Sequence, residues 1–413
     1  MKKLLLSIFV LAVVFSCSKD DETPIPECTV PGNLQVTNIS QTSVTITWES
    51  SNADSSFILE YGESGFALGT GTIVNTTSTS YTINNLAANT TYDYYLTANC
   101  GNGNESDPTS VRSFTTLFPL VVAEFLPNLS ELNLFEGDLE NLRPSVYTYE
   151  YDLITPLFTD YAHKQRLIAL PQGSSMVYQN DGLPEFPDNT VIAKTFYYNV
   201  DEQNPGLGKI IVETRVLIKI DGEWQTGNYK WNDAQTDAFY TTDGHVVPLS
   251  YTDTEGATVN LDYEIPSNTQ CFQCHNKSNI ITPIGPKLRN MHFNNQLEDL
   301  IGDGMLTNVT NLSELEALPS WEDTANFTLE ERARAYFDVN CAHCHQPEGS
   351  CGTETLLDLR YETRFNETSI YETRFSILTR IQNQIPDYGM PLIGTTIIHD
   401  EGVALILEYI NTL

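Results

Sequence analysis

Two copies of one five-residue motif constrain this sequence more than any other feature. Residues 271–275 read CFQCH and residues 341–345 read CAHCH. Each copy places two thiols three positions apart, which on a helix puts them on one side of a single turn. A histidine follows the second thiol directly in both copies. The chain holds only eight Cys and seven His in 413 residues, so two such copies are not expected by accident.

Covalent attachment of haem requires this arrangement of side chains. Two thiols one turn apart can each form a thioether with a haem vinyl group, and the adjacent imidazole then lies under the iron. A four-cysteine zinc site is the alternative, but it leaves the histidine after each pair unexplained. The sequence therefore predicts two covalently bound c-type haems. Their attachment residues would be Cys271, Cys274, Cys341 and Cys344, and their proximal iron ligands His275 and His345.

The sixth iron ligand is predicted for one haem and open for the other. Met390 precedes Pro391, which favours an extended backbone at Met390 and thus a loop position. A thioether from such a loop would complete the second haem. Pro266 blocks a continuous helix into the first motif, so no capped helix is expected to lead up to Cys271. For the first haem, the candidate sixth ligands are Met291, His292 and Met305, and a vacant position is equally compatible.

The N-terminus has the form of an export signal. Residues 1–16 combine two lysines with an apolar run over 4–14, too short to span a bilayer comfortably. Residues 14–17 read VFSC and resemble a lipobox, which implies acylation of Cys17 and a lipid anchor, followed by a tether up to residue 27. A plain signal peptide ending in Cys is the alternative. We expect an outer-membrane lipoprotein, on the periplasmic or the cell-surface face.

The net charge of the chain and the cysteines outside the two motifs indicate its cellular compartment and its class of partner. A net charge of −33 argues against nucleic acid, whose phosphates require basic patches. An acidic surface suits either good hydration or docking of a basic redox partner protein, whose identity the sequence does not give. An oxidising compartment favours a Cys28–Cys100 disulfide, which leaves Cys351 without a partner.

Residues 28–117 are predicted to form a β-sandwich. Residues 42–48 and 92–98 alternate with period two between Asn, Gly and Ser turns. The segment resembles a fibronectin type III domain, because Trp48 lies in the second expected strand and residues 86–92 match the tyrosine-corner pattern that ends at Tyr92.

The rest of the chain is predicted as a second β-rich domain followed by helices. Strands are expected at 193–198, 212–219 and 224–231, with a hairpin turn at Asp221-Gly222. A capping box at Thr328 and Glu331 opens a helix that runs into the second motif, and a final helix follows Asp400. We therefore expect a β-rich domain at 120–265, a first haem-binding segment at 266–320 and an α-helical, cytochrome c-like domain at 321–413.

Residues 120–413 also resemble an uncharacterised family of bacterial dihaem c-type cytochromes. The resemblance is carried by Met390-Pro391 and by segments 156–162, 194–198, 213–215, 231–238 and 333–340. It implies haem binding and electron transfer and supplies no substrate. The leading hypothesis is a membrane-anchored electron carrier of the cell envelope. Two alternatives stay open: a peroxidase-like haem oxidoreductase with an open first haem, and a binding or adhesion lipoprotein that uses the N-terminal sandwich.

Overall fold

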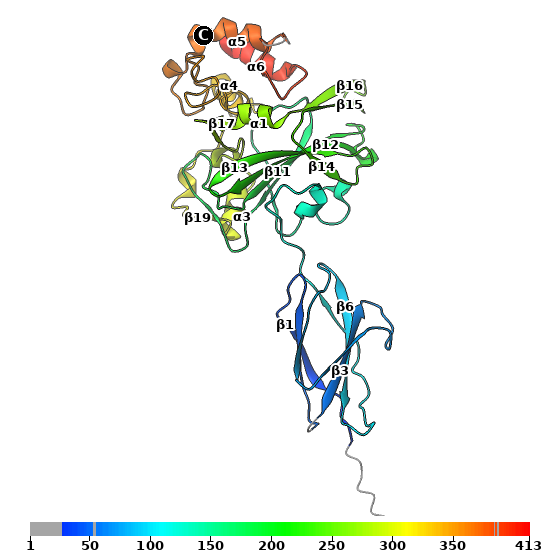
Figure 1. The fold of residues 1–413 in the computed structure, drawn as a ribbon. Helices are drawn as coiled ribbons and strands as arrows, with labels where there is room; N and C mark the ends of the chain where they lie inside the picture. The colour runs from blue at the N-terminus through cyan, green and yellow to red at the C-terminus, as the bar shows by residue number, and fades with distance from the viewer. Residues whose placement is uncertain (1–26, 53–54, 384, 386–387) are drawn as a thin grey trace, which may run out of the picture. The chain divides into compact units, whose positions relative to one another are not determined.

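The chain divides into two compact units, Met1–Pro119 and Leu120–Leu413. The computed structural model (Figure 1) describes residues 27–52, 55–383, 385 and 388–413. The predicted signal peptide and Cys17 lie outside these residues. Within the described part of the chain, no helix is long and apolar enough to cross a membrane. The segments expected at 120–265, 266–320 and 321–413 all lie in the second unit.

The first unit is a sandwich of two antiparallel sheets. One sheet has the order β1-β2-β5 and the other β4-β3-β6-β7. Their strands are β1 (Gly32–Thr37), β2 (Val44–Glu49), β3 (Ser56–Glu63), β4 (Thr72–Thr76), β5 (Ser80–Ile83), β6 (Thr91–Asn99) and β7 (Arg112–Thr115). Alternate residues of β2 and β6 point inward, as their period-two pattern predicts, and Trp48 and Tyr94 are buried between the sheets.

One disulfide and one hydrogen bond stabilise the sandwich. Cys28 and Cys100 form the predicted disulfide. The Tyr92 hydroxyl accepts a hydrogen bond from the Ala87 backbone N–H at 3.0 Å, which is the tyrosine corner expected from residues 86–92.

A six-stranded antiparallel sheet forms the centre of the second unit, in the order β14-β13-β12-β11-β9-β8. Its strands are β8 (Tyr149–Glu150), β9 (His163–Ala169), β11 (Val191–Asn199), β12 (Lys209–Ile220), β13 (Glu223–Trp231) and β14 (Ala238–Thr241). The predicted strands lie within β11, β12 and β13. Asp221 and Gly222 both have positive φ, 51° and 84°, as a two-residue hairpin turn requires.

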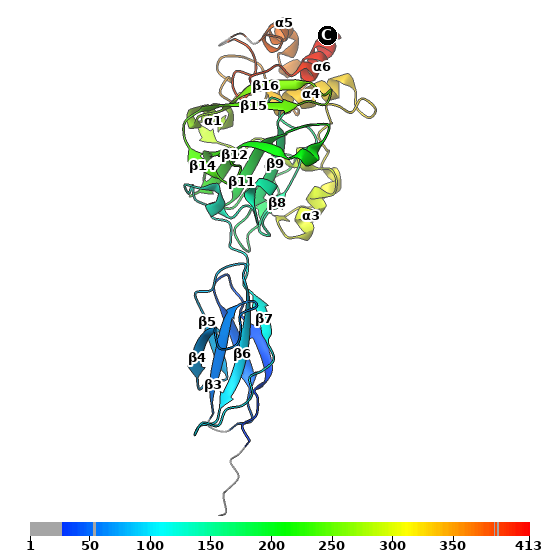
Figure 2. The same cartoon turned by 90° about the vertical axis from the view of Figure 1, so that its right-hand side faces the viewer.

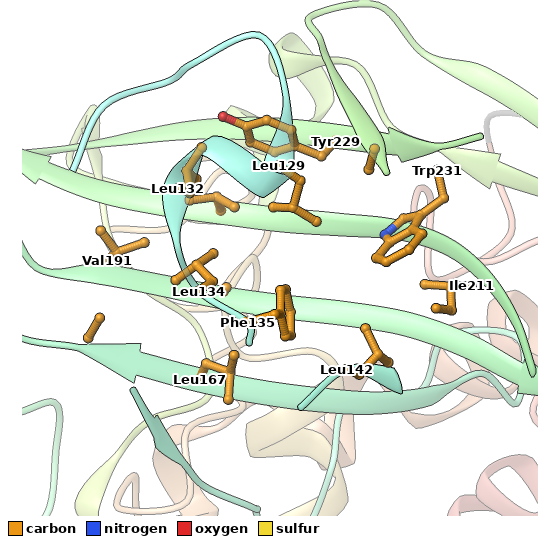
Figure 3. Packing of buried hydrophobic residues seen from close by; sticks show 14 of the residues in the cluster. Leu129, Leu132, Leu134, Phe135, Leu142, Leu167, Val191, Ile211, Tyr229 and Trp231 are labelled. Carbon is orange, nitrogen blue, oxygen red and sulfur yellow. The ribbon is translucent and has the colours of Figure 1, made fainter. Parts of the chain in front are cut away.

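One face of this sheet packs on the chain that leads into it. The short helix η1 (Leu129–Leu132) and the residues after it lie over the strands (Figure 3). Leu129 and Leu134 contact a surface of alternate strand residues that includes Val191 and Trp231.

The opposite face is covered at two places. Helices α2 (Leu288–Met291) and α3 (Gln296–Gly302) pack on the end that carries Ile168 and Ile192. The hairpin of β15 (His245–Thr252) and β16 (Thr258–Ile265) packs on the end that carries Phe196. Shorter pairs join β10 (Met176–Val177) to β19 (Leu306–Thr307) and β17 (Asn276–Lys277) to β18 (Ile280–Ile281).

The C-terminal residues form a small helical layer. Its helices are α4 (Leu329–Asn340), α5 (Ile370–Ile381) and α6 (Asp400–Ile410), which share one hydrophobic cluster around Phe337 and Ile406. Figures 1 and 2 show α5 and α6 beyond the β15–β16 hairpin as seen from the six-stranded sheet, and α4 at the level of the hairpin. The capping box at Thr328 and Glu331 is confirmed, because the Thr328 hydroxyl accepts from the Glu331 N–H at 3.2 Å.

Candidate cofactor site at the two Cys-x-x-Cys-His segments

The first motif lies on a short helix that begins after Pro266. Strand β16 ends at Ile265, so no helix leads into the motif from before the proline, as Pro266 predicts. Helix α1 (Asn268–His275) has Ser267 as N-cap and Gln270 completes a capping box, a feature that was not predicted. The helix places the Cys271 and Cys274 thiols on successive turns of one side.

His275 is oriented by the chain that follows it. Its Nδ1–H donates to the Thr282 carbonyl at 2.8 Å, which leaves Nε2 as the free nitrogen. Burial lowers the pKa of His275 to about 3, so the imidazole is neutral at physiological pH. A neutral imidazole whose other nitrogen donates to a backbone carbonyl is the usual state of a metal-ligating histidine.

The second motif follows helix α4. Cys341 is the C-cap of that helix, and the turn that follows hydrogen-bonds the His345 N–H to the Cys341 carbonyl at 3.0 Å. The buried His345 Nδ1 has no hydrogen-bond partner among the described residues. Burial also lowers the pKa of His345, which favours the neutral form of this imidazole.

A cavity of about 710 Å³ joins His345 to Met390. Its walls come from α4, α6 and the loop between α5 and α6, and they are mainly apolar, with Phe337 and Ile406 among them. The volume lies inside the range of about 300–1,000 Å³ common for cofactor pockets. The structure thus places the predicted proximal and sixth ligands of the second haem on one cavity. Cys341, Cys344 and the otherwise unassigned Cys351 also line it.

The loop that carries Met390 is held by a distant residue. The buried Asp160 carboxylate accepts from the backbone N–H groups of Thr396 and Ile397, at 2.8 and 3.2 Å, and from the Thr396 hydroxyl at 2.9 Å. Asp160 belongs to segment 156–162, which carries part of the family resemblance. The resembling segment therefore positions the wall of the second cavity.

A smaller cavity of about 270 Å³ adjoins the first motif. Cys274 and His275 line it, together with several cationic side chains from the six-stranded sheet and the α4–α5 region. None of the candidate sixth ligands lines it: Met291 and Met305 pack in the cluster under α2 and α3, and His292 Nδ1–H donates to the Leu315 carbonyl at 2.8 Å.

The two motif segments are joined to each other. The Cys274, His343 and Cys344 ligand atoms all lie within 4.8 Å of one another. Lys277 forms an ion pair with Glu348 at 3.1 Å. The hydrogen bond between the two thiols lowers the pKa of Cys274 and raises that of Cys344 to about 12.

This geometry separates the haem and zinc alternatives. A four-cysteine zinc site needs all four thiols around one ion, but Cys271 and Cys341 do not belong to the group that brings Cys274 and Cys344 together. Each motif instead keeps its histidine on its own cavity. The four thiols therefore do not surround one point, and the group that comes together consists of Cys274, Cys344 and His343.

His343 is the site residue that sequence reasoning missed. It lies inside the second motif, lines both cavities, and has a buried Nδ1 without a hydrogen-bond partner among the described residues. The signal was present, because the second motif contains one histidine more than attachment requires. What could not be inferred is that this histidine lies beside Cys274 of the other motif.

Comparisons with known proteins identify one part of the chain. Residues 29–112 match the fibronectin type III domain model, and comparison with curated proteins finds no match. Similar solved structures include a redesigned β-sandwich protein (29% identity, 22% of this chain and 95% of that chain covered, TM-score 0.20). Another is the fibronectin type III domain of human fibronectin type III domain containing protein 3 (24% identity, 24% and 94% covered, TM-score 0.21). A third is domains d3–d4 of the extracellular region of rat CD45 (12% identity, 28% and 82% covered, TM-score 0.19). The chain thus carries a fibronectin type III domain at residues 29–112, in front of a second, β-rich unit.

Proposed function

We propose that this chain is a lipid-anchored dihaem c-type cytochrome that transfers electrons in the cell envelope. The observation that carries the proposal is the pair of cavities, each of which is lined by the histidine of one Cys-x-x-Cys-His segment, and burial lowers the pKa of both histidines. A c-type haem supplies a one-electron iron couple when bound. The chain's own residues would hold the two groups covalently and exclude water from them.

The second cavity supports a closed, electron-carrying site. His345 and Met390 would hold the iron, and the apolar walls formed by Phe337 and Ile406 would keep the site dry. The ligand set changes little between redox states when both ligands are fixed by the fold. The resemblance of residues 120–413 to dihaem cytochromes supports the same function.

Mass spectrometry of the intact chain, matured with the cytochrome c machinery, tests the proposal. We expect the added mass of two haems. A Cys271→Ser/Cys274→Ser variant should retain one haem, and so should a Cys341→Ser/Cys344→Ser variant. An unmodified chain that carries zinc would contradict the proposal, and loss of zinc from either double variant would then identify its ligands.

We infer a second candidate function, binding or adhesion, from the fibronectin type III domain at residues 29–112. Domains of this architecture serve many cell-surface proteins as interaction modules. Binding to envelope polysaccharide by the full chain and by a variant without residues 28–117 tests this function. Equal binding by both would argue against it, and haem spectra of the two forms would show that the second unit is intact.

A further inference from the structure

A row of three cations crosses the middle of the six-stranded sheet. Arg166 on β9 is paired directly with Lys194 on β11, and Lys194 is paired directly with Arg215 on β12 (Figure 2 shows the three strands). The row lies on the face that α2, α3 and the β15–β16 hairpin cover at either end. Like charges directly opposite one another destabilise a sheet, so the row needs a compensating anion.

Carboxylates neutralise the two outer members of the row. Arg166 donates to Asp152 at 2.8 Å, and Arg215 donates to Glu213 at 2.5 Å. Lys194, between them, has no carboxylate partner among the described residues, and its Nζ lies 5.0 Å from the centre of the Phe196 ring. The central charge of the row is therefore the one left uncompensated.

Lys194 faces the first cavity together with Cys274 and His275. Other cations line this cavity, and each of them has a carboxylate within ion-pair distance. These pairs are Arg166–Asp152, Lys277–Glu348, Lys287–Asp338, Arg289–Glu362 and Arg360–Asp358. Among the described cations of the cavity, only Lys194 lacks such a partner.

The charged form of Lys194 is unfavourable in this position unless a ligand supplies an anion. Burial lowers the pKa of Lys194 far below its usual value, and the charges of Arg215, Arg166 and Lys164 lower it further. A charge in such a place is destabilising unless an anion meets it. A carboxylate in the first cavity would remove this destabilisation and restore the charged form of Lys194.

We propose that Lys194 is the counter-charge for a carboxylate of the group held by the first motif. The inference rests on the proposed function, under which that carboxylate is a haem propionate. It accounts for two segments that carry the family resemblance, 194–198 and 213–215, because together they supply the unpaired ammonium and the Arg215–Glu213 pair beside it.

Potentiometric titration of the two-haem protein tests this inference. Removing a cation near an iron favours its oxidised, more positive form, so Lys194→Met should shift one of the two reduction potentials downward. A pH dependence of the same potential should appear, because the unpaired propionate would then protonate more easily. Lys194→Arg should restore the wild-type behaviour. Lys209→Met is the matched control, since Lys209 lies on β12 and contacts Tyr197 instead of either cavity.

The outcomes separate this inference from the function on which it rests. Potentials of the Cys271→Ser/Cys274→Ser variant, which keeps only the second haem, assign the shifted potential. The inference is supported if the mass shows two haems and Lys194→Met shifts the reduction potential of the first haem. Two haems by mass with unchanged potentials in Lys194→Met overturns the inference and leaves the dihaem proposal intact. Absence of haem from both motifs in the wild type overturns both.

Discussion

The thiols of Cys274 and Cys344 lie within 4.8 Å of each other, although 70 residues separate them in the chain (344 − 274). Each is the second thiol of its motif, next to its histidine. Under the proposed function, each would carry a thioether at the edge of its haem, so the two haem edges that these residues hold would face one another. Under that function the two sites would act as one electron-carrying unit.

Replacement of Met390 should affect one haem only. Met390→Ala removes the thioether that shares a cavity with His345, so the methionine–iron absorption near the red end of the oxidised spectrum should disappear and one potential should fall. Optical spectra and potentiometry measure both effects. Met305→Ala is the control, because Met305 packs under α3 away from both cavities and should leave both haem spectra unchanged. Unaltered spectra in Met390→Ala would refute the assignment of this ligand.

The haem that binds external ligands should be the first. None of Met291, His292 and Met305 lines its cavity, so carbon monoxide or cyanide should bind there and should leave the second haem six-coordinate. Ligand-induced spectral changes in the Cys341→Ser/Cys344→Ser variant, which keeps only the first haem, measure this. Turnover of peroxide by that variant would favour the oxidoreductase alternative. If no ligand binds, His343, which also lines this cavity, becomes the residue to replace next.

Acid should destabilise the haem-loaded protein through His399. Its ring stacks on Phe158 at 4.1 Å and its Nδ1 is 2.8 Å from the Tyr336 hydroxyl. Burial lowers its pKa to about 4, and the nearby Glu401 opposes this shift only in part. In the unfolded chain the histidine has a pKa of about 6.5. Between pH 6.5 and pH 4, His399 is therefore protonated in the unfolded chain and neutral in the folded protein.

The free energy of unfolding should therefore fall as the pH decreases from about 6.5 to about 4, by up to about 1.4 kcal/mol per pH unit. Urea unfolding at a series of pH values measures the slope. His399→Gln keeps a partner for Tyr336 and should flatten the slope. An equal slope in His399→Gln and the wild type would show that other groups dominate.

The disulfide should stabilise the first unit and not the second. Cys28 and Cys100 enclose a loop with a sequence separation of 72 residues, and restricting such a loop in the unfolded state contributes about 4 kcal/mol. Cys28→Ser/Cys100→Ser should lower the unfolding transition of residues 28–117, followed by Trp48 fluorescence. The haem spectra should not change. Simultaneous loss of both units would contradict their independence.

Lipid anchoring should depend on Cys17, which lies outside the described residues. Cys17→Ser should release the protein from membranes into the soluble fraction, because the acylated thiol would be missing. Cys351→Ser keeps Cys17 and should remain membrane-associated. Membrane partitioning of Cys17→Ser equal to that of the wild type would exclude this anchor.

Local signals predicted the local features well. Thr328 with Glu331, Asp221 with Gly222, and Tyr92 each fix geometry within a few residues, and each has its expected conformation. The capping box at Ser267 and Gln270 is equally local, and it opens helix α1 just after Pro266. The unpaired state of Lys194 could not be predicted from the sequence. It depends on the pairing of β11 with β9 and β12, which places Arg166 and Arg215 on either side of Lys194.

The contact between Asp160 and Thr396 joins two segments that lie 236 residues apart in the chain. The Asp160 carboxylate is buried and meets three donors of this loop, two backbone N–H groups and one hydroxyl. A chain cut before Thr396 would therefore keep a buried carboxylate without these donors, which is destabilising. The wall of the second cavity thus depends on residues from both ends of the second unit, and neither end can be replaced without regard to the other.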